Sequence, residues 1–85
     1  MKEFTYTIKD PCGIHARPAG ELVKLLHGFS STISVTGGTG CCDGKKLIAL
    51  MKLRVKCGDA ITVQAEGDDE EAAVKGAQAF LEKNL

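Results

Sequence analysis

The chain is poor in aromatic side chains and carries no excess of charge of either sign. Its 85 residues include no Trp, one Tyr and three Phe, and 11 Lys and Arg balance 11 Asp and Glu. A neutral chain sets up no overall field that attracts nucleic acid or anionic lipid. It also lacks the paired strand aromatics on which RNA-binding sheets stack bases. We therefore expect no nucleic-acid partner, and any site for an anion must be local.

Long apolar runs are missing too. No uninterrupted stretch approaches the ~20 residues that a bilayer crossing needs, and residues 1–4 include a charged pair where a signal peptide would be apolar. We therefore expect no membrane insertion and a cytoplasmic location. The hydrophobic fraction of 44% and the mean hydropathy of -0.03 are typical of a globular protein. At this length, residues 1–85 are expected to form a single domain.

The four cysteines are fewer than a disulfide scaffold of this size usually carries, so we expect reduced thiols. Cys41 and Cys42 are neighbours on a predicted strand and should face opposite sides of it. Cys57 falls in a predicted loop. Cys12 precedes His15 with C-x-x-H spacing, but one Cys and one His fall short of a tetrahedral ligand set. We interpret Cys12 as a structural thiol and predict no metal site.

Two periodicities divide the chain into seven predicted elements. Apolar residues at every second position predict strands, and apolar residues three and four apart predict helices. The predicted elements are a strand at 4–8, a helix at about 16–27, strands at 32–36 and 39–42, a helix at 47–54, a strand at 61–66, and a last helix whose stripe ends at 81. Gly37-Gly38 predicts a tight turn between two antiparallel strands. Asp68 with Glu71 resembles a capping box for the last helix.

Alternating strands need cover on one face only, and amphipathic helices can supply it. We predict an α+β fold in which a four-stranded antiparallel sheet is covered on one face by three helices. This is a two-layer open-faced sandwich with the order β-α-β-β-α-β-α. The predicted core consists of Phe4, Tyr6, Ile8, Leu22, Leu26, Ile33, Val35, Ile61, Val63 and Phe80.

A sharp turn followed by a helix start marks the most informative segment. After Gly13, His15 is predicted at the N-cap, and Ala16 and Arg17 as the first helical residues, whose amides have no partner within the helix. Pro18 suits such a helix start. An imidazole beside free amides, a positive helix end and an Arg fork is predicted to hold an anion such as phosphate. On residue types alone, an N-cap His beside a solvated Arg is an equally open interpretation.

Residues 13–19, Gly-Ile-His-Ala-Arg-Pro-Ala, resemble the active-site signature of HPr, the histidine-containing phosphocarrier of the phosphoenolpyruvate-dependent sugar phosphotransferase system. The predicted element order is similar to the HPr fold over nearly the whole chain. The resemblance implies that His15 accepts a phosphoryl group on Nδ1 from phosphorylated Enzyme I and passes it to a sugar-specific IIA domain. It implies that Arg17 and the backbone amides of Ala16 and Arg17 steady the phosphate. We thus expect a monomeric carrier, not an independent enzyme, that uses no cofactor.

The resemblance also implies a partner-binding surface on the second helix. Leu47, Ile48 and Met51 occupy the place where HPr proteins present apolar residues beside the histidine. Leu47 and Met51 share a helical stripe that is typical of a core, so core and partner roles stay open for both, whereas we favour a partner role for Ile48. Lys46 stands where many Gram-positive HPr proteins carry a regulatory Ser. No hydroxyl is therefore available at that position.

The alternative function is an HPr-like regulatory adaptor that binds partner proteins without transferring phosphate. The joint presence of His15 and Arg17 favours the carrier, because an adaptor would not need both. Lys46 favours it weakly, since family adaptors are described as acting through the phosphorylated Ser. Residues 51–54 further depart from the family by carrying charge where many relatives have Gly.

Overall fold

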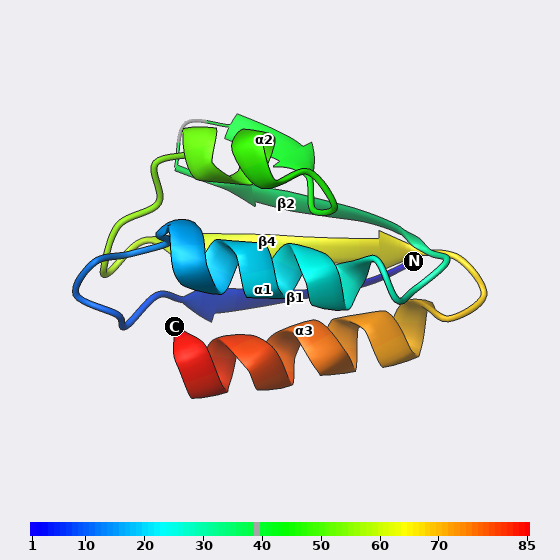
Figure 1. The fold of residues 1–85 in the computed structure, drawn as a ribbon. Coiled ribbons are helices and arrows are strands. Elements are labelled where there is room, and N and C mark those ends of the chain that lie inside the picture. Colours follow the sequence, from blue (N-terminus) through cyan, green and yellow to red (C-terminus); the bar gives the residue numbers. More distant parts are fainter. Residues whose placement is uncertain (39) are drawn as a thin grey trace.

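The computed structural model describes residues 1–38 and 40–85 of the chain. Its elements are β1 (Lys2–Thr7), α1 (Ala16–Leu26), β2 (Thr32–Gly37), β3 (Gly40–Asp43), α2 (Leu47–Lys52), β4 (Ala60–Glu66) and α3 (Glu70–Asn84). The strands form an antiparallel sheet in the order β1-β4-β2-β3, and the helices lie on one side of it (Figure 1). The predicted open-faced sandwich is confirmed. Within the described residues, no helix combines the length and apolarity that a membrane crossing requires.

The register of the sheet places apolar residues of neighbouring strands in common rows. Val63 of β4 pairs with Phe4 of β1 on one side and with Val35 of β2 on the other, and Ala65 pairs with Ile33. Directly paired residues project from the same face of a sheet. All of these side chains except Phe4 are fully buried. These rows therefore form the apolar face of the sheet, against which the helices pack.

The core lies between this apolar face of the sheet and the helices, and most of the residues predicted for the core are buried there. The buried ones are Ile8, Leu22, Leu26, Ile33, Val35, Ile61 and Val63. Phe4, Tyr6 and Phe80 are only partly buried and pack against the core from its rim. The two β1 residues lie on an edge strand, which is covered from one side only. On α3 the sheet-facing positions belong instead to Ala77 and Leu81, which are buried.

The boundaries of the hairpin differ slightly from the prediction. Gly37, predicted in the turn, belongs to β2 and pairs with Gly40. The strand predicted at 39–42 is β3 at Gly40–Asp43, and Thr39 lies outside the described residues. The antiparallel pairing of the two strands is confirmed.

Helix α2 ends two residues before the predicted end at Arg54. Arg54 has a φ of +55°, in the left-handed region, and its N–H donates to the Met51 carbonyl at 3.3 Å. This reversal turns the chain inward, so that Leu53 and Val55 on either side of Arg54 are buried. Glycine adopts a left-handed conformation without strain. Arg54 therefore holds a conformation that a Gly would adopt more readily.

The prediction of a capping box for α3 is wrong. The helix begins at Glu70, with Asp69 at the N-cap, so Asp68 and Glu71 do not form the predicted pair. Instead the Gly67 N–H donates to Glu70 Oε1, and the Glu70 N–H donates to the Gly67 carbonyl, both at 3.2 Å. Gly67 lies two residues before the N-cap and has no side-chain acceptor, so this pair closes a turn ahead of α3 and is not a capping box, in which the N-cap side chain accepts the N3 N–H.

Asp69 joins the start of α3 to the loop between α1 and β2. Its carboxylate accepts the backbone N–H of Ser30 at 2.8 Å and that of Ser31 at 2.9 Å, and it also accepts the Ser31 hydroxyl. Together these hydrogen bonds lower the pKa of Asp69 below its usual value, and the bond from the Ser31 hydroxyl has the largest effect. The ionised carboxylate therefore links two segments that are far apart in the sequence.

Candidate functional site

The loop between β1 and α1 fixes where His15 enters the helix. Gly13 has a φ of +68°, and a Cβ at this position would lie 2.4 Å from the Val55 carbonyl oxygen and 2.8 Å from Lys56 Cα. The next residue, Ile14, donates its N–H to the same Val55 oxygen at 3.1 Å. Only glycine satisfies both the conformation and the close approach. The loop is thus packed against the segment that follows α2.

His15 occupies the N-cap of α1, as predicted. Its backbone is extended, with φ −121° and ψ 172°, and its carbonyl accepts the Ala19 N–H at 3.0 Å. Its side chain makes no capping hydrogen bond and is 42% exposed. The amides of Ala16 and Arg17 donate to no acceptor among the described residues, and Pro18 has no N–H to donate. The site therefore offers unused donors at the positive end of a helix.

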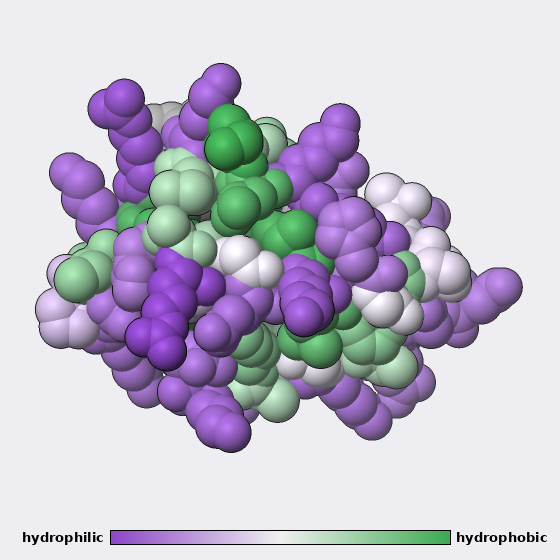
Figure 2. Space-filling view, in the orientation of Figure 1, coloured by the Kyte–Doolittle hydropathy of each residue, from purple (hydrophilic) through white to green (hydrophobic). Residues whose placement is uncertain are grey.

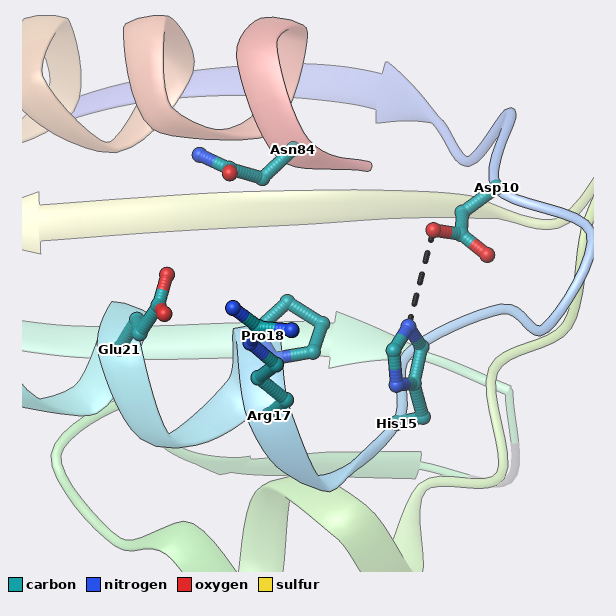
Figure 3. A pocket seen from close by; sticks show the side chains of 6 residues that line it. All are labelled: Asp10, His15, Arg17, Pro18, Glu21 and Asn84. Carbon is teal, nitrogen blue, oxygen red and sulfur yellow. Dashed lines mark ion pairs between the residues drawn. The ribbon is translucent and has the colours of Figure 1, made fainter.

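A hollow of about 190 Å³ opens beside the imidazole. Its lining comes from the β1–α1 loop, from α1 and from the end of α3 (Figure 3), and consists of Asp10, His15, Arg17, Pro18, Glu21 and Asn84. The Arg17 side chain is exposed and lies beside Pro18 in Figure 3, apart from the imidazole. The structure thus brings His15 and Arg17 to one hollow without placing them in contact.

The two ring nitrogens of His15 have different surroundings. Nε2 lies 3.6 Å from Oδ2 of Asp10. Nδ1 is on the side of the ring that faces the first turn of α1 (Figure 3). The sequence analysis missed Asp10, for which an Asp-Pro turn shortly before the histidine was the available signal. It also missed Glu21 and Asn84, which carry no motif.

Comparison with known proteins identifies the family of this site. Residues 2–83 match the family model described as the PTS HPr component phosphorylation site. The chain belongs to the HPr family. It is 44% identical to the phosphocarrier protein HPr of Mycoplasma genitalium over 85 residues, which cover 99% of this chain and 97% of that protein.

Solved structures of HPr proteins share the fold. A histidine-containing phosphocarrier protein of Mycoplasma matches with a TM-score of 0.93 at 32% identity, covering 96% of this chain and 93% of that one. HPr from Thermoanaerobacter tengcongensis matches with a TM-score of 0.92 at 40% identity, covering 98% and 93%. The resemblance of the chain to the HPr family is confirmed. The chain is a phosphocarrier of the phosphotransferase system and not an independent catalyst.

The predicted partner-binding residues Leu47, Ile48 and Met51 all lie on α2, and their side chains differ in exposure. Ile48 is 65% exposed, Met51 is 38% exposed, and Leu47 is partly buried against the core, while Leu50 carries the buried face of the helix. Figure 2 shows apolar surface over α2. Lys46 is exposed at the N-cap of α2 and makes no capping hydrogen bond. The structure thus separates exposed apolar side chains from the core on this short helix.

All four cysteines are free thiols. Cys12 and Cys57 are exposed in loops. On β3, Cys41 is exposed and Cys42 partly buried, as expected for neighbours on opposite faces of a strand. Burial raises the pKa of the Cys42 thiol, and the nearby Cys41 and Asp43 raise it further. A thiol that resists ionisation is a poor nucleophile, so Cys42 is expected to be unreactive.

Proposed function

We propose that this chain accepts a phosphoryl group on Nδ1 of His15 from phosphorylated Enzyme I and passes it to a sugar-specific IIA domain. The observation that supports this most directly is the half-exposed imidazole at the N-cap of α1, whose Nδ1 is on the side of the ring that faces the first turn of that helix (Figure 3). A helix N-terminus with free N–H groups favours phosphate oxygens through both hydrogen bonds and the dipole. Membership of the HPr family favours a carrier over a regulatory adaptor. The proposal takes residues 1–85 as one monomeric domain in the cytoplasm.

Arg17 supports the phosphorylated state in this proposal. Its side chain lines the hollow and forms no ion pair with any acidic residue that the structure describes. A charge-assisted hydrogen bond contributes about 1.5–3 kcal/mol, and ~1.4 kcal/mol changes an equilibrium tenfold. A few such contacts hold a phosphoryl group without trapping it, which suits a carrier that must release its load.

Enzyme I and IIA domains are proposed to bind at a docking patch formed by Leu47, Ile48 and Met51. Ile48 and Met51 are among the exposed large hydrophobic residues of the described chain. Lys46 and Lys52 stand at the two ends of the same helix, and both are exposed. An apolar centre between cationic ends fits a partner surface that is apolar with acidic residues at its rim.

Labelling by phosphoenolpyruvate and Enzyme I tests the acceptor. The wild type should become an acid-labile phosphoprotein, and the His15→Ala variant should take up no label. His27→Ala is the matched control, because His27 is the other histidine of the chain and its Nε2 contacts the Lys45 carbonyl oxygen at 2.9 Å, outside the hollow. Labelling of His15→Ala, or loss of labelling in His27→Ala alone, would contradict the proposal.

The docking patch is tested by the dependence of the labelling rate on Enzyme I concentration. Ile48→Lys should raise the concentration that gives half the maximal rate by roughly tenfold, since an interface anchor contributes more than about 1 kcal/mol. Ala72→Lys adds the same charge at an exposed position of α3 and should leave the concentration unchanged. Equal behaviour of the two variants would remove Ile48 from the interface.

A further inference from the structure

Asp10 is fixed by three hydrogen bonds that leave one carboxylate oxygen available. Its N–H donates to the Leu85 backbone oxygen at 2.9 Å, and its carbonyl accepts the Gly13 N–H at 2.9 Å. Its Oδ1 accepts the Cys12 N–H at 2.8 Å. Leu85 is itself buried, and the Asp10 side chain is 25% exposed. The remaining oxygen, Oδ2, is the one that faces His15.

The imidazole therefore lies between groups of opposite electrostatic character. The Asp10 carboxylate, 3.6 Å from Nε2, attracts a proton to that nitrogen. Nδ1 is on the side of the ring that faces the first turn of α1 (Figure 3), and the positive end of a helix favours a lone pair over an N–H on that side. Both influences select the same neutral form of the ring. At 3.6 Å the pair is longer than a direct hydrogen bond and acts through charge, as is often so for catalytic pairs in unliganded structures.

We propose that Asp10 is a positioning residue, which holds the imidazole proton of His15 on Nε2 and so leaves Nδ1 as the phosphoryl acceptor. The inference rests on the proposed function and assigns Asp10 a part in it. The Nδ1 lone pair forms the new bond to phosphorus while the bond between phosphorus and the phosphorylated donor breaks, and the donor atom keeps that electron pair. No proton leaves the ring in this step. The ring becomes cationic with its proton on Nε2, and the Asp10 carboxylate stabilises that charge.

The position of the proton is measured by ¹⁵N NMR of the ring nitrogens at a pH where the imidazole is neutral. Asp10→Asn keeps an oxygen for the Cys12 N–H and removes the charge. Asp59→Asn is the matched control, because Asp59 accepts the Lys56 N–H at 3.0 Å in a different loop and does not line the hollow. We expect the Nδ1–H form of His15 to increase in Asp10→Asn and to stay at the wild-type level in Asp59→Asn.

The rate of labelling by phosphoenolpyruvate and Enzyme I gives the second measurement. Loss of the Asp10 charge is expected to slow the labelling of Asp10→Asn about tenfold, which corresponds to about 1.4 kcal/mol in the activation free energy. Asp59→Asn should be labelled at the wild-type rate. Slower labelling of Asp10→Asn without a change in proton position would show a merely structural role and overturn the inference.

The two proposals fail in different ways. A wild type that takes up no label overturns the proposed function. A wild type that is labelled, beside an Asp10→Asn variant that keeps both the wild-type rate and the wild-type proton position, overturns the role of Asp10 alone.

Discussion

Replacing Gly13 by Ala tests whether the close packing of the β1–α1 loop sets the position of His15. A left-handed backbone destabilises an L-residue by about 1–2 kcal/mol. The Ala variant also has an unfolded chain with less conformational freedom, which stabilises the folded state by about 0.4–1 kcal/mol. A methyl group 2.4 Å from the Val55 carbonyl oxygen also meets backbone, which cannot rotate away. Overpacking of this kind costs about 1–3 kcal/mol. We expect Gly13→Ala to lower the free energy of unfolding by about 2–4 kcal/mol.

The Gly58→Ala variant separates the cost of placing an Ala at a positive φ from the cost of the steric clash with residues 55–56. Gly58 also has a positive φ, of +92°, but a Cβ there would meet nothing within 4 Å. This variant carries the conformational cost alone, and its expected loss is about 1 kcal/mol. The difference between the two variants, about 1–3 kcal/mol, then measures the close contact of the loop with residues 55–56.

Denaturant unfolding of both variants gives the two free energies, and labelling by Enzyme I under conditions where both are folded gives the functional effect. Because the clash pushes the loop away from residues 55–56, Gly13→Ala should also be labelled more slowly, whereas Gly58→Ala should keep the wild-type rate. Equal losses of stability in the two variants, or a wild-type labelling rate in Gly13→Ala, would refute the reasoning.

Three further changes probe the rest of the fold. Leu22→Ala removes a fully buried side chain of α1 and should cost about 2–5 kcal/mol of unfolding free energy in urea; a loss near zero would remove Leu22 from the core. Gly20→Ala should gain about 0.5–1 kcal/mol in the same assay, because Gly20 lies inside α1 with nothing within 4 Å of an added Cβ; destabilisation would contradict this. The folded-state pKa of Asp69 is depressed below 3.8, so its stabilisation is present above about pH 4 and is lost as the pH falls through the lower folded value. Asp69→Asn should therefore flatten the acid side of a plot of stability against pH, and an unchanged slope would exclude this link.

The layout of helices and strands was predictable because each element buries one face. That requirement imposes a period of two on β2 and β4 and helical spacing on α1, and the sequence shows both patterns directly. The end of α2 was less predictable. The apolar pattern continues beyond Lys52, and the left-handed conformation of Arg54 runs against the local preference of an Arg residue.

The candidate site was predictable only where its geometry is local. Gly13 and Pro18 bracket a turn and a helix start, and they place His15 at the N-cap without any knowledge of the fold. Asp10 is different, because its backbone is held by Leu85 from the other end of the chain. The Asp-Pro turn marks Asp10 in the sequence, but its contact with Leu85 leaves no periodic or spacing signal, so the orientation of its carboxylate toward Nε2 emerges only from the folded structure.

The shallow hollow around His15 leaves the imidazole open to solvent on the side where a partner would approach. In the proposed function a phosphorylated His15 would be exposed in the same way, so the exclusion of water from the reacting atoms would come from the protein that docks on it. Partners with different active-site shapes can then share one acceptor, because none has to fit inside a cleft. Between encounters the N–P bond of the proposed phosphohistidine would be exposed to water, and the time that the carrier spends unbound would then set how much of it is lost by hydrolysis.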